Sequence, residues 1–455
     1  MRRITLHDSR AGKLVPLEPR EPGRVGIYAC GPTVYGPIHV GNARPFVVFS
    51  LLKRFLEHEG LAVTLVINVT DVNDKIYDAA REAGVDSETL AAEMTARYLR
   101  DTDALGLGRP DREPLASETI AEILTLIEAL IERGHAYAAG GDVYFRVRSW
   151  PSYGELSHRD VDDMDQGEGV EGAERKEDPL DFALWKGEKA GEDTSWPSPW
   201  GRGRPGWHIE CSAMAETILG TGFEVHGGGV DLLFPHHENE AAQTAAARGT
   251  PLARIWMHNG MVRLEDEKMS KSAGNVFLLG EALAAHGREA LLMYLCGGHY
   301  RQPLAYSQAR LEEAAARAGR VREAARRLAP GPSPAELAPL RERFLDALAA
   351  DFNTAAAIGA MFEWVREANR REGEVGDADL RAMLGLLGLE TLLEPGAGAA
   401  GSGPGAAARA LLERREAARA ARDYAEADRL RDELESAGWA VRDGPDGPEL
   451  LPAGR

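Results

Sequence analysis

The sequence predicts an α/β protein in which a parallel sheet, interrupted by an insertion, precedes a helical bundle and a small terminal domain. Residues 25–29 (VGIYA) are typical of a buried strand, and a Gly/Pro loop connects them to apolar residues at helical spacing from Phe46. Residues 62–69 (AVTLVINV), rich in β-branched side chains, are typical of a second buried parallel strand. From residue 308 the composition changes to Ala, Leu, Arg and Glu, which favours packed helices.

Bulk composition limits the class of protein. With 455 residues, 44% hydrophobic and 27% charged, the chain is long enough for several ordinary globular domains. A net charge of −19 excludes a surface that binds nucleic acid everywhere but allows a local basic face. Three widely separated cysteines do not make a disulfide framework, and no apolar run is long enough to span a membrane. We therefore expect a soluble, cytoplasmic protein without a membrane segment.

The remaining elements follow in chain order. A polar, Gly- and Pro-rich stretch at 154–199 indicates an insertion into the α/β domain. The other expected elements are helices at 87–105 and 117–133, a strand at 142–147, a helix entered by a loop at 206–218, a short strand at 223–226, a flexible linker at 394–408, one basic helix at 409–436, and a strand-like tail at 439–451.

Two stretches are candidates for binding phosphate. The strand, loop and helix around His39, Gly41 and Asn42 would aim free backbone N–H groups and the positive end of a helix at an anion, with His39 as a further donor. Lys268 and Lys271, on a loop bounded by acidic residues, could close over a polyphosphate. For the lysines, the alternative is an ordinary run of solvated charges. For the loop around His39, the alternative is a connection without a ligand, because short Gly/Pro loops between strand and helix are common in α/β proteins.

Polar and glycine residues follow two further strands, where ligands of open α/β sheets bind. Thr70 and Asp71 follow the strand at 62–69 and are candidates for lining a pocket, although they could simply cap the next helix. Gly228, Gly229 and Asp231 resemble a site where the backbone approaches a nucleotide and a carboxylate binds a ribose hydroxyl.

A metal site is possible from Cys30, Cys211, His236 and Glu240. His236 and Glu240 lie four residues apart and would share a helix face, and this mixed donor set suits Zn²⁺ better than Mg²⁺ or Ca²⁺. No CxxC motif supports the proposal, so both cysteines could instead be buried small hydrophobes. We expect His237 to point elsewhere on its helix and Cys296 to belong to the core.

The terminal basic helix is a candidate for binding nucleic acid. Arginines recur along it with Tyr424 among them, and arginine with an exposed aromatic ring suits single-stranded bases. Interspersed Glu and Asp make an ordinary salt-bridged surface helix an equal alternative.

Several of these stretches together resemble a known family. PTVYGPIHVGN (32–42) resembles the HIGH signature of class I aminoacyl-tRNA synthetases, and KMSKS (268–272) is their second signature letter for letter. Cys30 before the first signature, WHIECSAM (207–214) and HGGGVDLLFPHHENE (226–240) are similar specifically to cysteinyl-tRNA synthetases. GHYR (298–301) and DFNT (351–354) extend the likeness over nearly the whole chain.

The resemblance implies an order of domains. A Rossmann-type catalytic domain would occupy 1–115 and 204–262, split by a connective insertion at 116–203. The KMSKS loop and stem-contact region would follow at 263–307, a helical-bundle domain at 308–392, a linker at 393–408, and a small α/β anticodon-binding domain at 409–455.

The resemblance also implies an activity and its residues. The chain would join L-cysteine to tRNA(Cys) through a cysteinyl-adenylate, using ATP with Mg²⁺ and one Zn²⁺ that binds the substrate thiolate. We expect a monomer, because the sequence contains nothing like a dimerisation heptad. Zinc would be held by Cys30, Cys211, His236 and Glu240, and the amino acid bound by Gly31, Thr70 and Trp207. ATP would contact His39, Gly41, Asn42, Gly228, Gly229, Asp231, Lys268 and Lys271, with His39 and both lysines catalytic, and the anticodon would be bound by Arg419, Tyr424 and Asp428.

Three rival functions share part of this pattern. A ligase that joins cysteine to a glucosamine-inositol acceptor has the zinc site and both signatures but no anticodon-binding domain, which the terminal helix argues against. A catalytically silent homologue would not need His39, Lys268, Lys271 and all four metal donors together. A zinc hydrolase would leave KMSKS unexplained.

Overall fold

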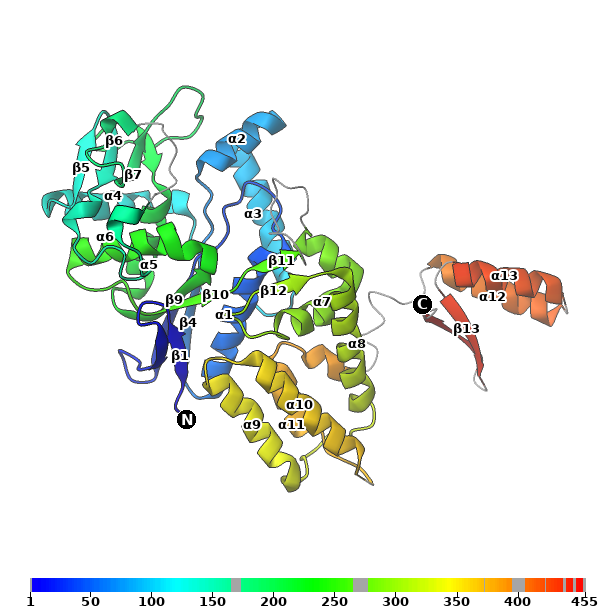
Figure 1. Ribbon diagram of the computed structural model, residues 1–455. Coiled ribbons are helices and arrows are strands. Elements are labelled where there is room, and N and C mark those ends of the chain that lie inside the picture. Colours follow the sequence, from blue (N-terminus) through cyan, green and yellow to red (C-terminus); the bar gives the residue numbers. More distant parts are fainter. Residues whose placement is uncertain are drawn as a thin grey trace. The chain divides into compact units, whose positions relative to one another are not determined.

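The computed structural model describes residues 2–164, 173–264, 277–371, 373–394, 406–421, 423–436, 439–444 and 447–452. The chain divides into two compact units, Met1–Glu390 and Thr391–Arg455, which are described separately (Figure 1). Among the described helices, none has the length and apolar character needed to cross a membrane.

A four-stranded parallel sheet lies at the centre of the first unit. Its strands run in the order β10 (Ala253–Asn259), β9 (Phe223–Gly229), β3 (Arg24–Ala29) and β4 (Ala62–Ile67). The strands predicted at 25–29 and 62–69 are confirmed as parallel neighbours, the second ending two residues early. Because all four strands are parallel, their carboxyl ends meet at one edge of the sheet. The residues that follow those ends form the candidate site.

Helices cover both the sheet and its insertion. Helix α1 (Val40–His58) packs along β3, β4 and β9, where its Phe49 ring approaches Gly227. Helices α5 (Trp207–Leu219) and α6 (Glu238–Arg248) pack against each other. Buried side chains from the sheet and from these two helices, including Tyr28, Cys211 and Trp256, form one hydrophobic cluster.

The insertion has a core of its own. Helix α4 (Ile120–Glu132) accompanies an antiparallel sheet in the order β5 (Ala136–Ala139), β6 (Asp142–Phe145), β7 (Phe182–Gly187) and β8 (Gly203–Pro205). Ile127, Phe145, Phe182 and Trp185 are buried within it. Helices α2 (Asp74–Ala83) and α3 (Ser87–Asp103) precede it, and the Tyr77 hydroxyl of α2 donates to Thr194 O at 3.1 Å.

The predicted helical bundle is confirmed downstream. Helix α7 (Leu279–Leu295) leads to α8 (Gln308–Ala325), α9 (Ala338–Ala349), α10 (Thr354–Asn369) and α11 (Ala378–Leu386). In Figure 1, α9 to α11 lie at the bottom of the first unit, and the insertion lies at its upper left. Cys296, which directly follows α7, is buried as expected.

Short elements complete the first unit. Strands β1 (Thr5–Asp8) and β2 (Lys13–Pro16) are antiparallel, and β11 (Val262–Leu264) pairs in parallel with β12 (Leu304–Tyr306). Single turns of helix occur at Ala116–Glu118, Val147–Ser149, Val161–Asp163, Ala173–Arg175, Val230–Leu232, Leu233–His237 and Ala335–Leu337. A further turn, Glu390–Leu393, begins at the last residue of this unit and continues into the second.

The second unit contains a helix pair and a hairpin. The single helix predicted at 409–436 is wrong, because the segment forms α12 (Ala406–Ala420) and α13 (Tyr424–Ser436). Asp423 causes the break, since its carboxylate accepts from Glu426 N at 3.2 Å and thereby caps α13. The predicted strand-like tail is an antiparallel pair, β13 (Trp439–Gly444) and β14 (Gly447–Pro452). Leu434 and Leu450 are buried between helix and hairpin.

Candidate active site and metal centre

A pocket of about 390 Å³ opens at the carboxyl edge of the parallel sheet. The loop between β3 and α1, the end of β9 and the segment after β10 line it. Eight of the predicted site residues are among its lining residues: Cys30, Gly31, His39, Gly41, Asn42, Trp207, Gly229 and Asp231. A cavity at this edge is where an open α/β sheet binds its ligands.

His39 is held in one orientation at the start of α1. Its Nδ1 accepts from Asn42 N at 3.1 Å, and Asn42 Oδ1 accepts from His39 N at 3.2 Å, which makes a reciprocal helix cap. Because Nδ1 is an acceptor, the proton of the neutral ring is on Nε2, which can donate to a ligand. A Cβ on Gly41 would lie 2.9 Å from the His39 ring, so only glycine lets the ring fold over the helix end.

The base of the pocket depends on a close approach between two strand ends. A Cβ on Gly31 would lie 1.7 Å from Asn68 O, and Gly31 N donates to Asn68 Oδ1 at 2.9 Å. Thr70 lies behind this loop rather than in the pocket lining, because its backbone pairs with Pro32 O and Val34 N and its hydroxyl accepts from Asn68. Asp71 does not line the pocket either, and its carboxylate accepts a hydrogen bond from Ser117 N at 3.0 Å.

The four predicted metal donors converge beneath the pocket. Donor atoms of Cys30, Cys211, His236 and Glu240 all lie within 4.8 Å of one another, and all four residues are buried. Glu240 Oε1 lies 3.0 Å from His236 Nε2 and 3.4 Å from Cys30 Sγ. Sequence spacing predicted only that His236 and Glu240 would share a helix face, and the tertiary structure adds both cysteines to this face.

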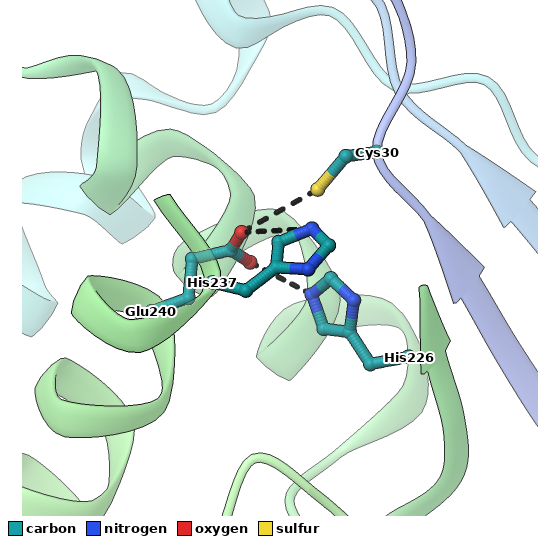
Figure 2. A group of neighbouring side chains, drawn as sticks. All are labelled: Cys30, His226, His237 and Glu240. Carbon is teal, nitrogen blue, oxygen red and sulfur yellow. Dashed lines mark hydrogen bonds and ion pairs between the residues drawn. The ribbon is translucent and has the colours of Figure 1, made fainter. Parts of the chain in front are cut away.

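A second donor set shares two of these residues. Cys30, His226, His237 and Glu240 also bring their donor atoms within 4.8 Å, and Figure 2 shows them around the Glu240 carboxylate. The expectation that His237 points elsewhere is therefore wrong. Positions three and four residues before Glu240 both lie on its side of the helix, and His237 Nε2 is 3.9 Å from Glu240 Oε1.

Hydrogen bonds distinguish the two sets. His208 Nδ1 and His236 Nδ1 are 2.9 Å apart and bonded, which leaves His236 Nε2 to face Cys30 and Glu240. His226 Nε2 donates to Glu240 Oε2 at 2.8 Å, and His237 Nδ1 bonds His258 Nε2 at 2.7 Å. Ligating residues are usually oriented by such outer partners. This pattern favours Cys30, Cys211, His236 and Glu240 as ligands, with His208 and His226 supporting them.

The electrostatics of the cluster suit a cation. Burial raises the pKa of the Cys30 thiol well above its ordinary value, and lowers the pKa of His208 and His236 to about 3. The imidazoles are therefore neutral and have a lone pair to offer. Among the described residues, no lysine or arginine pairs with the buried Glu240, so a divalent cation would supply the missing positive charge. The cluster could hold a metal ion.

Trp207 and Asp231 both line the pocket, and Trp207 lies against the metal cluster. The Trp207 ring stacks on His236, with centroids 4.2 Å apart and planes 23° apart, so one face of the pocket is aromatic next to the donor set. Asp231 is exposed, and a Cβ on Gly229 would lie 2.4 Å from its Oδ1. Gly228 does not line the pocket, because Leu232 and His237 cover its Cα.

Sequence reasoning missed several residues of the site. His208, His226 and His258 are buried partners of the metal cluster. His208 and His226 stand within the motifs at 207–214 and 226–240, whereas His258 lies in β10, outside every motif singled out above. Tyr35, Lys75, Tyr98 and residues 259–262 also line the pocket. A role near the site could have been suspected for these histidines, because His226 and His258 lie in strands and His208 lies at the start of a helix. The pocket-lining set depends on strand order, which the sequence does not fix.

Other predicted residues lie elsewhere. Lys268 and Lys271 are outside the described residues. In the second unit, Arg419 is exposed near the end of α12. Tyr424, 63% exposed, begins α13, and exposed Asp428 lies four residues later on the same side of that helix. Arg419 therefore lies just before the break between α12 and α13, and Tyr424 and Asp428 lie just after it.

Comparison with family models covers most of the chain. Residues 16–316 match tRNA synthetases class I (C) catalytic domain, residues 343–389 match the DALR domain, and residues 403–448 match the cysteinyl-tRNA ligase anticodon binding domain.

Curated relatives match along nearly their whole length. Cysteine--tRNA ligase of Alkalilimnicola ehrlichii is 48% identical over 462 residues, covering 98% of this chain and 98% of the relative. Cysteine--tRNA ligase of Halorhodospira halophila is 47% identical, again covering 98% of each chain. Among solved structures, Mycobacterium tuberculosis methionyl-tRNA synthetase in complex with methionyl-adenylate has a TM-score of 0.59 at 16% identity, covering 81% of this chain and 89% of that one. This likeness concerns the fold.

Proposed function

The chain belongs to the cysteine--tRNA ligase family, and from that membership we propose how its pocket performs the reaction. The enzyme ligates L-cysteine to tRNA(Cys) with ATP, through a cysteinyl-adenylate. The observation that carries the proposal is the buried set of two thiols, an imidazole and a carboxylate directly beneath the nucleotide-type pocket. This combination suits a substrate that carries both sulfur and a carboxylate to be activated.

Zn²⁺ is the metal that the donor set suits best. Cys30, Cys211, His236 and Glu240 would hold it, since zinc accepts sulfur, nitrogen and oxygen ligands in a compact site. When bound, zinc would bind the thiolate of the amino acid and favour it over the hydroxyl of serine, which stays protonated at neutral pH. His208 and His226 orient the ligands, and Trp207 covers one side of the amino acid.

The first step needs positioning and charge neutralisation rather than a protein nucleophile. The cysteine carboxylate attacks the α-phosphate of ATP, an oxygen–phosphorus bond forms, and pyrophosphate leaves with the electrons of the broken bond. His39 Nε2–H and the N–H groups at the start of α1, beside Gly41 and Asn42, donate to the phosphates. Lys268 and Lys271 are proposed from their signature to assist, ATP enters with Mg²⁺, and Asp231, with Gly228 and Gly229 nearby, binds the ribose.

The amino acid is proposed to sit between the base of the pocket and the cluster. Gly31 allows close backbone approach there, and Thr70 supports the Gly31 loop from behind through its hydrogen bonds. In the second step a ribose hydroxyl of the terminal tRNA adenosine attacks the activated carbonyl, and AMP leaves. Arg419, Tyr424 and Asp428 are proposed to contact the anticodon, because an exposed ring beside a guanidinium can stack on unpaired bases.

The test is cysteine-dependent exchange of pyrophosphate into ATP, with serine as control. We expect exchange with cysteine, about one zinc per chain, and loss of both in Cys211→Ala. Lys271→Ala should lower the activation rate without changing the zinc content. If completely demetallated enzyme still selects cysteine over serine as sharply as before, the proposed role of zinc is wrong.

Domain order is proposed from the same resemblance. A truncation within the predicted linker at 393–408 should keep adenylate formation and weaken aminoacylation of tRNA, because the second unit carries the anticodon-type domain. Equal retention of both steps would contradict that assignment. The glucosamine-inositol rival is disfavoured by the match of residues 403–448 to the anticodon binding domain. The monomeric state and cytoplasmic location stay predictions.

A further inference from the structure

Lys75 is the only lysine or arginine among the described residues that line the active-site pocket. The other ionisable groups in that lining include the His39 imidazole, the Asp231 carboxylate and the Cys30 thiol, and none of these is a permanent cation. The substrates that the proposed function brings to this pocket carry phosphate, as ATP and as the 3′ end of tRNA. A pocket that receives several negative charges would be expected to contain a cation.

The charge of Lys75 is not neutralised by its neighbours. Asp74, the adjacent carboxylate, already pairs with Lys186 at 2.9 Å and with Arg204. Within the described residues, no carboxylate lies within ion-pair distance of the Lys75 ammonium. Lys75 is exposed at the start of α2, so the cation is accessible to a ligand.

Tyr35 gives this cation a defined place in the pocket. The Lys75 Nζ lies 5.5 Å from the centroid of the Tyr35 ring, which lines the same pocket from the loop before His39. An exposed cation–π contact is weak, whereas a hydrogen bond between two charged groups is roughly two- to three-fold stronger. The Tyr35 ring can therefore position the Lys75 ammonium in the pocket, and an anion can replace this weak contact with a stronger hydrogen bond.

The anchoring of α2 keeps Lys75 at the pocket. The Asn73 side chain caps the helix by accepting from Lys75 N at 3.1 Å. The Asp74 pairs tie the same turn to β7 and β8 of the insertion through Lys186 and Arg204. The backbone of Lys75 is thus fixed on one side, while its side chain extends to the pocket.

We propose that Lys75 is a substrate-binding residue that contacts a phosphate group in the active-site pocket. The proposal rests on the proposed function, because that function brings phosphates to this site. The phosphate belongs either to the triphosphate of ATP or to the phosphodiester next to the 3′-terminal adenosine of tRNA. Both sources offer the same ligand chemistry, and they act in different steps of the reaction.

The test compares Lys75→Met with Lys13→Met in the full-length, zinc-loaded enzyme. Lys13 is an exposed lysine on β2 that does not line the pocket, so its replacement removes the same charge elsewhere. Lys75→Arg keeps the cation and should restore function. Zinc content and thermal midpoint should match the wild type in all variants, which shows that the fold and the metal cluster are intact.

Two assays separate the sources of phosphate. If ATP is the ligand, Lys75→Met should lower kcat/KM for ATP in pyrophosphate exchange by about ten-fold or more. If tRNA is the ligand, exchange should be unchanged. The rate of cysteine transfer from preformed adenylate to tRNA should then fall by about ten-fold. The plot of log kcat/KM for tRNA against log salt concentration should become less steep by about 0.7.

Either result supports the proposal. Values for Lys75→Met within two-fold of Lys13→Met in both assays would overturn it, provided that the wild type performs cysteine-dependent exchange. If the wild type itself shows no such exchange, it is the proposed function that fails. The two failures are therefore distinguishable.

Discussion

The two overlapping donor sets make a sharp prediction about which residues bind the metal. Cys30 and Glu240 belong to both sets, so their replacement does not discriminate. Cys211 belongs only to the set that we propose, and His226 only to the other. We expect Cys211→Ala to lose zinc almost entirely, because a thiolate ligand disappears from a four-donor site.

The expected effect at His226 follows from its one bond to the carboxylate. His226 Nε2 donates to Glu240 Oε2 at 2.8 Å, and both side chains are fully buried. A hydrogen bond to a charged group is worth about 1.5–3 kcal/mol, which corresponds to roughly 10- to 150-fold in affinity. His226→Leu should therefore weaken zinc binding by about 10- to 100-fold, the range typical of supporting residues. His226→Gln, which keeps an N–H donor, should lose less.

The assay is a competition titration of zinc against a chromogenic chelator, with circular dichroism as the control for folding. That control matters because the His226 ring also stacks on Trp256, with centroids 4.4 Å apart. If folded His226→Leu lost zinc completely while Cys211→Ala kept it, the alternative donor set would hold the metal. If Cys211→Ala bound zinc with the affinity of the wild type, Cys211 would not be a ligand, and the proposed donor set would be wrong.

Three further predictions concern the pocket and its support. Trp207→Ala should raise KM for cysteine by roughly ten-fold in pyrophosphate exchange with less effect on KM for ATP, since its ring stacks beside the donor set where we propose that cysteine binds. Asp231→Asn should raise KM for ATP by about ten-fold and leave zinc content unchanged, as measured by exchange kinetics and metal analysis. Burial by itself would raise the pKa of Asp351, but hydrogen bonds from His299, Tyr300 and other donors lower it to about 2. Because this pKa is below the ordinary value of 3.8, the ionised carboxylate contributes about 2 kcal/mol of stability above pH 4, and this contribution is lost as the pH falls towards 2. The urea unfolding midpoint of Asp351→Asn should therefore fall less between pH 4 and pH 2 than that of the wild type.

Local sequence was sufficient for the elements whose residues repeat a simple pattern. The apolar runs at 25–29 and 62–69 are strands β3 and β4, and the Ala-rich segment after 308 is helical. Local patterning failed at 409–436, where Asp423 ends one helix and caps the next. Apolar periodicity continues across such a break, so only the capping residue distinguishes one helix from two.

The candidate site shows the division between sequence and tertiary structure most clearly. The sequence by itself determined which chemical groups are present: the two cysteines, the His236–Glu240 pair on one helix face, and the HIGH-type loop before α1. Only the tertiary structure decided which of them meet. Cys30 is 206 residues from His236 along the chain, and the order of β10, β9, β3 and β4 brings them within 3.5 Å.

The same reason explains the residues that the sequence did not reveal. His226 reaches Glu240 because β9 lies between β3 and β10, and Lys75 reaches the pocket because β4 runs parallel to β3. Strand order and register are set by packing among distant segments, which no short motif encodes. The sequence therefore determined the candidate metal donors and the loop that we propose binds phosphate, and parallel strand pairing decided the partners of each.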